Sequence, residues 1–224
     1  WYYSSAKSIA DKLNFELVIQ NYHLFKGKKF LKIEFDSIWD EIQDKKEYTI
    51  FNEKLYYDYE LKYLISDFDQ NVLNISKNTK LEGLYQSEKY FFGDLAKLKK
   101  HIILDPKIIN STNVDKKICI LNIRGGEYKR HKKFMLRKKY WENAMNNFKN
   151  ISSVNDFLIV TDDFKYAKSL FPNLEIIHGD IQKCYATIFN CSNIIVSNST
   201  FSYFPCTTGL KKKIIAPMYW ARPI

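Results

Sequence analysis

The stretch KICILNIRGGEY, residues 117–128, decides the fold. Its first seven residues form a continuous apolar run, which is typical of a parallel strand that is covered on both faces. An arginine, two glycines and an acid follow at once. Ligands of open α/β sheets bind beyond the carboxyl ends of the strands, so the residues after this run are the first candidates for a binding site.

Downstream of this stretch, apolar runs alternate with segments of helical spacing. Helix-like spacing of Tyr140, Trp141, Ala144, Met145 and Phe148 comes first. Further strands are predicted at 156–161, 174–178, 193–197 and 212–217, and further helices at 162–171, 180–191 and 198–210. Five strand units with short links predict a doubly wound parallel sheet.

The upstream half is less regular. We predict a helix over 1–14, a strand over 15–20, a helix-rich region over 21–80, and an amphipathic helix late in 83–102. Pro, Asn, Ser and Asp in 104–117 are typical of a connector. The sequence therefore predicts two domains, 1–112 and 113–224.

Charge divides the chain in the same way. Of 35 Lys and Arg and 25 Asp and Glu, 17 of each sign fall in 1–112, so the whole net charge of +10 lies in 113–224. We call eight of these cations the basic cluster: Arg124, Lys129, Arg130, Lys132, Lys133, Arg137, Lys138 and Lys139. This cluster is either a solvated, Lys-rich loop or a positive field that recruits an anionic partner.

Residues that can bind a ligand follow three of the predicted strands. Arg124 can grip a phosphate with two parallel hydrogen bonds, or it can be a surface residue of a tight Gly-Gly turn. Asn198, Ser199 and Thr200 can cap a helix, or they can present its N-terminus to an anion. Asp162 and Asp163 can stabilise a helix dipole, or they can contact a nucleobase, a sugar or a metal.

The sequence gives no sign of the common nucleotide-binding motifs, of a metal site or of a membrane span. The sequence has no GxxxxGK[ST] or GxGxxG motif, no metal-ligand spacing and no apolar run of 18 residues. The four cysteines form no CxxC pair, which favours a reducing compartment over a disulfide framework.

Four segments together resemble the bacterial α-1,2-fucosyltransferases, glycosyltransferase family 11. NIRGGEY (122–128) is similar to that family's His-x-Arg-Arg-Gly-Asp-Tyr motif, and FLIVTDD (157–163) is similar to its strand ending in Ser/Thr-Asp-Asp. GLYQSEKYF (83–91) resembles a Gly-Tyr-Phe-Gln-Ser-x-x-Tyr-Phe stretch, and residues 180–220 resemble a block that contains Asn-Ser-Ser/Thr-Phe-Ser-Trp-Trp and ends in Ala-Pro-x-x-Trp.

The resemblance implies a GT-B fold of two facing Rossmann-like lobes, with an acceptor-side lobe in 1–112 and a nucleotide-sugar lobe in 113–224. It also implies transfer of fucose from GDP-fucose, with inversion, to the 2-hydroxyl of a galactoside, without a metal or other cofactor. Arg124 would hold the GDP phosphates, and Glu127 would be the base that deprotonates the acceptor. Donor-binding positions would be Asn122, Arg124, Asp162, Asp163, Asn198, Ser199, Thr200 and Phe201.

The chain departs from the family pattern at four places. Asn122 stands for His, Gly125 for the second Arg, Glu127 for Asp, and Tyr203-Phe204 for the Trp pair. The family begins with a strand and a Gly-rich loop, which we expect to be missing before Trp1.

We therefore expect an inverting fucosyltransferase of surface polysaccharide or O-antigen synthesis, whose partners are a GDP-sugar and a galactose-containing glycan. We place it in the cytoplasm, in peripheral association with the inner face of the membrane. Two alternatives stay open: a noncatalytic relative that binds sugar nucleotides, and a module that binds nucleic acid or another polyanion.

Overall fold

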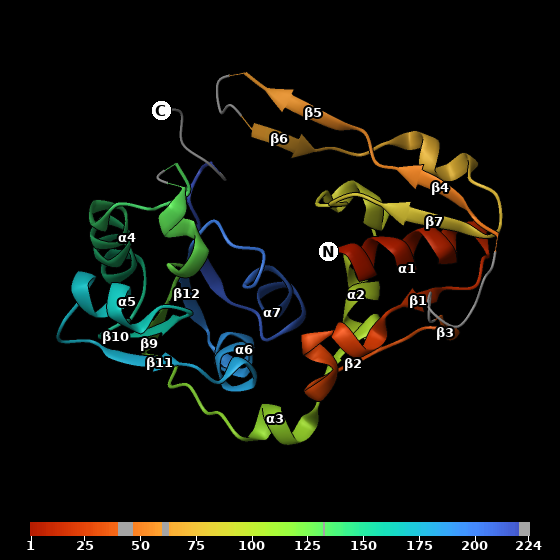
Figure 1. The fold of residues 1–224 in the computed structure, drawn as a ribbon. Coiled ribbons are helices and arrows are strands. Elements are labelled where there is room, and N and C mark those ends of the chain that lie inside the picture. The colour runs from red at the N-terminus through yellow and green to blue at the C-terminus, as the bar shows by residue number, and fades with distance from the viewer. Residues whose placement is uncertain (40–46, 60–62, 132, 220–224) are drawn as a thin grey trace. The chain divides into compact units, whose positions relative to one another are not determined.

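The computed structural model of the protein consists of two compact units, Trp1–Ile103 and Leu104–Ile224 (Figure 1). It describes residues 1–39, 47–59, 63–131 and 133–219. Lys132 of the basic cluster and Trp220 of the family resemblance lie outside the described residues. The two units are described separately below.

The division falls at 103/104, whereas the connector predicted a boundary at 112/113. The intervening helix α3 (Pro106–Asn110) packs beside helix α6 of the second unit. The Asn190 amide donates to the carbonyls of Ile109 (2.7 Å) and Thr112 (2.8 Å). These hydrogen bonds attach the connector to the second unit.

The second unit is a five-stranded parallel sheet in the order β11-β10-β9-β12-β13. Its strands are β9 (Ile118–Ile123), β10 (Asp156–Thr161), β11 (Glu175–His178), β12 (Asn193–Val196) and β13 (Lys213–Ile215). The connecting helices are α4 (Lys138–Ile151), α5 (Phe164–Leu170), α6 (Ile181–Asn190) and α7 (Tyr203–Thr208), with the 3-10 turn η5 (Gly126–Arg130) after β9. The predicted parallel sheet is confirmed.

Both faces of this sheet are buried, which explains the continuous apolar strands. Side chains such as Leu121, Ile159 and Phe148 pack with α4 and α5 on one face. Ile120, Val160 and Ile188 pack with α6 and α7 on the other (Figure 1). Alternate residues of a strand point to opposite faces, so a strand buried on both sides has no polar positions to alternate with apolar ones.

The predicted helix over 198–210 is wrong at its start. Helix α7 begins only at Tyr203, and residues 198–202 form turns. The Ser199 side chain accepts a hydrogen bond from the Phe201 backbone N–H (3.3 Å), and the Ser202 hydroxyl donates to the Ser199 carbonyl (3.1 Å). Such side-chain bonds compete with helix formation, so the polar segment stays irregular.

The first unit is built from short elements around helix α1 (Tyr2–Leu13). Its strands form pairs: β1 (Val18–Gln20) with β3 (Ser37–Trp39), β2 (Leu31–Ile33) with β8 (Ile102–Leu104), β4 (Thr49–Asn52) with β7 (Thr79–Glu82), and β5 (Leu55–Asp58) with β6 (Tyr63–Ser66). The remaining elements are helix α2 (Leu95–His101) and the 3-10 turns η1 (Tyr22–Leu24), η2 (Lys26–Lys29), η3 (Gln70–Asn74) and η4 (Glu88–Phe91). A Rossmann-like sheet for this unit stays a prediction.

The prediction of a helix-rich region over 21–80 is wrong. Its described residues contain six strands and three 3-10 turns and no α-helix. Tyr, Phe and β-branched residues favour strands, but each strand is only three or four residues long. Elements of this length show neither helical nor strand periodicity clearly.

A buried carboxylate connects the strands of the first unit. Glu53 follows β4 and accepts hydrogen bonds from the Leu84 N–H (2.7 Å), the Tyr85 N–H (2.8 Å), the Ser66 hydroxyl (2.6 Å) and the Tyr90 hydroxyl (3.1 Å). Tyr85 and Tyr90 belong to the core of this unit, together with Ile9 and Val72. Glu53 therefore completes a core that is small and rich in hydroxyl groups.

All four cysteines of the chain are free. None of the described helices is long and apolar enough to cross a membrane. The described residues also hold no group of three or more His, Cys, Asp or Glu side chains placed to bind a metal ion.

Candidate functional site

The candidate site lies where the strand order of the second unit reverses. In chain order the sheet reads 3-2-1-4-5, so the direction of winding changes between β9 and β12. Ligands of such sheets bind in the crevice beyond the carboxyl ends of the strands at this point. The residues that follow β9, β10 and β12 here are Arg124, Asp162 and Ser197.

Arg124 is held by two carboxylates. Its Nη1 lies 2.7 Å from Oδ2 of Asp162, and its Nη2 lies 3.0 Å from Oε1 of Glu127. The guanidinium also stacks over the Tyr128 ring, with 5.5 Å from Cζ to the ring centroid. Asp162 is 29% exposed and Glu127 is 68% exposed, so the contact with Glu127 is the one that solvent and ions reach more readily.

The two glycines after Arg124 allow the turn to approach the end of β10. The Gly125 N–H donates to Oδ1 of Asp162 (2.9 Å). A Cβ atom on Gly125 would lie 2.7 Å from Cβ of Asp163, and one on Gly126 would overlap Oδ2 of Asp162. Gly126 also has a φ of +31°, which disfavours other residues. The space beside these glycines is therefore filled by the two aspartates.

Asp163 pairs with the first lysine of the basic cluster. Its Oδ2 contacts Nζ of Lys129, and its Oδ1 accepts from the Tyr166 N–H (3.0 Å) as the cap of α5. Burial raises the pKa of this carboxyl, but the hydrogen bonds from Lys129 and from the Tyr166 and Gly126 backbones outweigh burial and hold the pKa below its ordinary value. Asp163 is therefore a carboxylate near neutral pH.

Asn122 lies in the penultimate position of β9 and is buried, with 5% of its surface exposed. Its amide donates a long bond of 3.4 Å to the Val160 carbonyl. Within the described chain, three buried polar atoms at this strand edge lack a hydrogen-bond partner: Asn122 Oδ1, Arg124 Nε and Ser197 Oγ. Buried polar groups are normally paired, so these atoms indicate a site for a polar ligand.

The segment after β12 contributes mostly backbone contacts. The Asn198 amide donates to the Phe134 carbonyl (3.1 Å), and the Asn198 carbonyl accepts from the Tyr128 hydroxyl (3.1 Å). Ser199 is buried and bonded within its own turn. Phe201 packs its edge against the Tyr185 ring, with centroids 6.0 Å apart. Thr200 lies in the same turn, with its carbonyl accepting from the Tyr203 N–H (3.3 Å).

The structure thus joins Arg124, Glu127, Asp162 and Asp163 in contacts around one turn. The 198–201 segment is tied to the same turn through Tyr128. Sequence reasoning missed Tyr128 and Ser197 as members of the site, although both stand beside residues that were singled out. No periodicity marks them, because their importance arises from contacts between separate strand ends.

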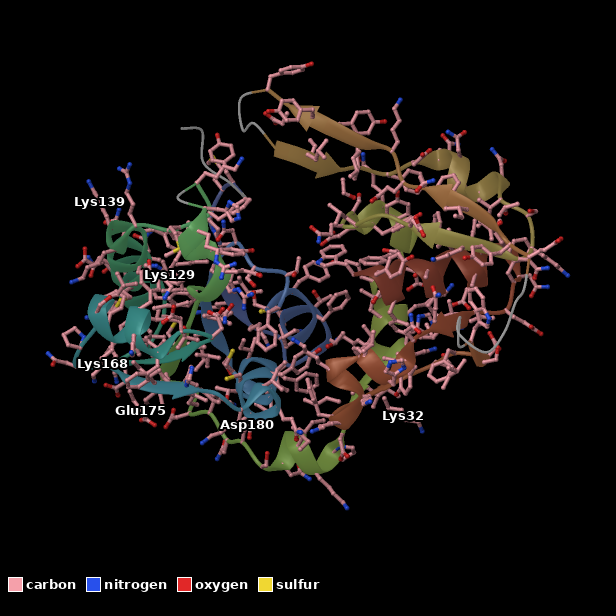
Figure 2. The ribbon with its side chains drawn as sticks, in the orientation of Figure 1. Lys32, Lys129, Lys139, Lys168, Glu175 and Asp180 are labelled. Atoms are coloured by element: carbon pink, nitrogen blue, oxygen red, sulfur yellow. The ribbon has the colours of Figure 1, made fainter. Side chains whose placement is uncertain are left out.

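The basic cluster begins at this turn and continues into α4. Arg130, Arg137, Lys138 and Lys139 are exposed, whereas Lys133 lies over the Phe134 ring. Figure 2 shows Lys129 and Lys139 on one side of the second unit and Glu175 and Asp180 on the other. The site therefore lies on the side of this unit that carries Lys129 and Lys139.

Chemically, the site can bind an anion at Arg124. Within the turn itself two cations, Arg124 and Lys129, face three carboxylates, Glu127, Asp162 and Asp163. An incoming phosphate must compete with Glu127 or Asp162 for the guanidinium. Asp162 is fixed by two bonds to the turn, so Glu127 is the carboxylate that an anion would displace first.

No protein-family model matches the chain, and no curated protein matches it. Among solved structures, the chain is similar to POFUT1 at 9% sequence identity. The match to its apo form covers 97% of this chain and 93% of that chain, with a TM-score of 0.55. The match to its complex with GDP-fucose covers 96% and 92%, with a TM-score of 0.50. In another structure, a complex with GDP, the match covers only 62% of this chain and 55% of that chain, with a TM-score of 0.41. At this identity the likeness shows a shared fold.

Proposed function

We propose that the protein is a glycosyltransferase that binds GDP-fucose in its second unit and transfers fucose. The observation that carries this proposal is the set of three unpartnered buried polar atoms, on Asn122, Arg124 and Ser197, at the switch point of the sheet. A nucleoside diphosphate sugar offers both the phosphate oxygens that Arg124 can grip and the polar groups that an amide and a hydroxyl can bind. The crystallised GDP-fucose complex of POFUT1, which has a similar fold, supports this choice of donor.

The finer assignment follows the sequence resemblance to the α-1,2-fucosyltransferases. We propose a GT-B arrangement in which the first unit serves the acceptor. The acceptor would be the 2-hydroxyl of a galactoside in a surface polysaccharide, and the product would have inverted configuration. We also propose that the reaction needs no metal and takes place in the cytoplasm near the membrane surface.

In the proposed reaction, Arg124 holds the diphosphate and stabilises the charge that develops as it leaves. The phosphates displace Glu127 from the guanidinium, which frees a carboxylate next to the donor. Glu127 is then the proposed base for the acceptor hydroxyl. Asp162 is proposed to act on the donor through Arg124. The nucleotide is proposed to be surrounded by Asn122, Asp163, Asn198, Ser199, Thr200 and Phe201.

Ligand-induced stabilisation tests the donor most directly. A ligand that binds only the folded state raises the melting temperature, so GDP and GDP-fucose should raise it and UDP-sugars should not. Arg124→Lys should weaken GDP binding about tenfold, because lysine cannot form the two parallel bonds of a guanidinium. Arg137→Lys is the matched control, since Arg137 is an exposed cation of the same cluster.

Transfer of fucose to a galactoside then tests the chemistry. Glu127→Gln should abolish transfer while GDP still binds, and added EDTA should leave the rate unchanged. GDP binding without any transfer would favour the noncatalytic alternative. Stabilisation by oligonucleotides but by no guanine nucleotide would overturn the proposal.

A further inference from the structure

The first unit also has a parallel strand pair, and the carboxyl end of such a pair is a place where ligands can bind. Strands β1 and β3 run in parallel, with Gln20 opposite Trp39. Asn21 directly follows β1, and its N–H donates to the Trp39 carbonyl (3.3 Å). Both residues therefore lie at the strand end, where the loops of α/β folds present their side chains.

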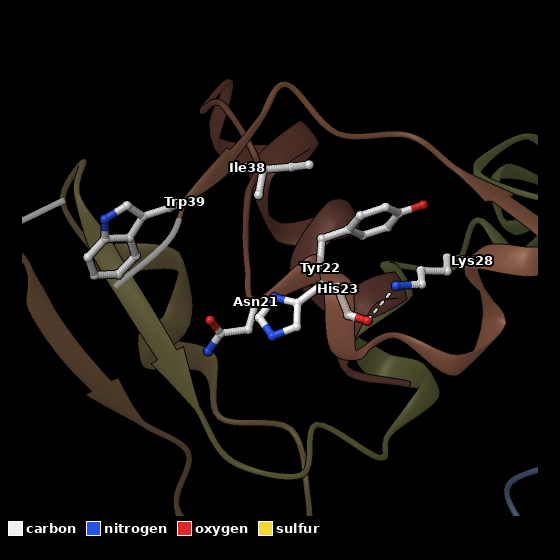
Figure 3. Close-up of a pocket in the computed structure, with 6 residues that line it drawn as sticks. All are labelled: Asn21, Tyr22, His23, Lys28, Ile38 and Trp39. Carbon is white, nitrogen blue, oxygen red and sulfur yellow. Dashed lines mark hydrogen bonds between the residues drawn. The ribbon is translucent and has the colours of Figure 1, made fainter. Parts of the chain in front are cut away.

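A pocket of about 280 Å³ opens at this end of the pair. It is lined by Asn21, Tyr22, His23, Lys28, Ile38 and Trp39. Figure 3 shows Trp39 on one side and Tyr22 on the other, with Asn21 and His23 between them. Two aromatic side chains with an amide, an imidazole and an ammonium group provide apolar contact for a ring and donors for its substituents.

The pocket is shaped by local contacts before any ligand binds. Asn21 has a φ of +53°, a left-handed conformation that asparagine tolerates better than most residues. Lys28 donates to the His23 carbonyl (2.6 Å), which holds the ammonium at the pocket (Figure 3). The Trp39 ring meets the Tyr48 ring edge-on, with centroids 5.1 Å apart. The backbone at Asn21 and two of the lining side chains, those of Lys28 and Trp39, are thus restrained.

The residues that line the pocket include one lysine and no carboxylate. Residues 21–33 contain four lysines and His23 and no aspartate or glutamate. None of the six lining residues is acidic. A neutral ligand could accept a hydrogen bond from Lys28, but a carboxylate would gain a charge-assisted hydrogen bond, which is roughly twice as strong.

We propose that this pocket binds a saccharide unit that carries a carboxylate, of the hexuronic acid type. The sugar ring would lie against Trp39 and Ile38, its hydroxyl groups would meet Asn21 and His23, and its carboxylate would pair with Lys28. The volume suits one monosaccharide unit of a longer glycan. This site goes beyond the donor site of the second unit and does not rest on the function proposed there.

Titration of the whole chain with methyl β-D-glucuronide, followed by NMR of the tryptophan indole N–H groups, tests the proposal. Trp39→Phe assigns the Trp39 signal, which should shift in a saturable way. Lys28→Met should lower the affinity about fivefold, the effect of losing a charge-assisted bond at an exposed position. Lys29→Met, in the same 3-10 turn but outside the pocket, should leave the affinity unchanged.

Two further ligands separate ring binding from charge binding. Methyl β-D-galactoside should bind more weakly than the glucuronide and should not respond to Lys28→Met, and acetate should not shift the Trp39 signal. The proposal is overturned if the Trp39 signal does not shift, if Lys29→Met weakens binding as much as Lys28→Met, or if acetate reproduces the shift. GDP titration is a separate measurement, so failure of the donor proposal would not be mistaken for failure here.

Discussion

The two units of the chain use their least exposed carboxylates in opposite ways. Glu53 in the first unit accepts four hydrogen bonds from neutral donors in the interior. Asp162 and Asp163 in the second unit pair with Arg124 and Lys129 beyond the carboxyl ends of the strands. The neutral donors hold Glu53 in place and leave it no cation to share with a ligand. Arg124 and Lys129, in contrast, lie at solvent-accessible strand ends, where a ligand anion can replace a carboxylate as their partner. The carboxylate of the first unit is thus structural, and those of the second unit prepare a binding site.

The cores of the two units explain this difference. In the second unit, a continuous sheet supplies apolar residues to both faces. In the first unit, the strands occur in pairs, and the core contains Tyr85 and Tyr90. Glu53 accepts from the Tyr85 N–H and from the Tyr90 hydroxyl. A buried carboxylate satisfies several donors at once.

The largest effect is expected for Glu53→Ala. The substitution removes the acceptor of two backbone N–H groups and of the Ser66 hydroxyl, whereas the Tyr90 hydroxyl can still donate to the Asp67 carbonyl (3.1 Å). Buried groups left unpaired cost about 1–3 kcal/mol each when water cannot reach them. We expect a loss of about 3 kcal/mol in the free energy of unfolding of the first unit, since some donors will relax toward solvent. Urea unfolding followed by near-ultraviolet circular dichroism of the tyrosines measures it.

Glu82→Ala is the matched control for this prediction. Glu82 lies on β7 in the same unit and pairs with Lys80 at 3.0 Å, but its side chain is 44% exposed. An exposed ion pair of this kind contributes less than about 1 kcal/mol. Equal losses for the two variants would show that Glu53 is not the centre of the first unit.

The next effect concerns Gly125, where the family pattern has a second arginine. A Cβ atom at this position would lie 2.7 Å from Cβ of Asp163 and 2.9 Å from Cδ1 of Tyr166. Gly125→Ala should therefore cost about 2 kcal/mol, the usual price of overpacking a tight contact. Gly125→Arg should cost at least as much and should not improve GDP binding, which a calorimetric titration would check. Tighter GDP binding by Gly125→Arg would contradict this account of the turn.

The same contrast between units explains what could be predicted from the sequence. The strands of the second unit were found because burial on both faces produces long apolar runs, such as 118–123, with short links between them. In the first unit, strands of three or four residues carry no usable period, and the pairing of β1 with β3 depends on contacts far apart in sequence. Glu53 gave no signal, since a lone glutamate between two short strands resembles a surface residue.

The candidate site was predicted in part for a related reason. Arg124, Asp162 and Asp163 could be located because each directly follows a predictable strand. What the sequence could not indicate is that Asp162 holds both the Arg124 guanidinium and the Gly125 N–H. That contact depends on the register of β9 against β10, and the register is set by packing of the whole sheet.

A smaller effect is expected for Asp162→Asn, which tests whether this residue positions Arg124. The amide keeps an acceptor for the Gly125 N–H but loses the ion pair with the guanidinium. Because this ion pair is partly exposed, solvent screening reduces its contribution to stability. We expect a loss of about 1 kcal/mol in the stability of the second unit, against a few tenths for Glu127→Gln. Urea unfolding at low and at high salt measures both, and the difference should shrink with salt. An equal loss for the two variants at low salt would mean that Asp162 does not fix the turn.

The smallest effect is a difference between the units in their response to acid. Burial lowers the pKa of His101 in the first unit, and the attraction of Asp11 opposes this only in part. A lowered pKa means that the folded state resists protonation, so this contribution to stability is complete above about pH 6.5 and declines as the pH falls below it. The pKa of Asp163 in the second unit is also lowered, and its contribution is complete above about pH 3.9 and is lost only below that value. Acidification should therefore weaken the first unit over a higher pH range than the second.

His101→Gln should flatten the pH dependence of unfolding near pH 6, and Asp163→Asn should flatten it only below about pH 4. If Asp163→Asn changed the dependence near pH 6, the carboxylate would not be held ionised by Lys129, and the contrast between the two units would lose its electrostatic basis.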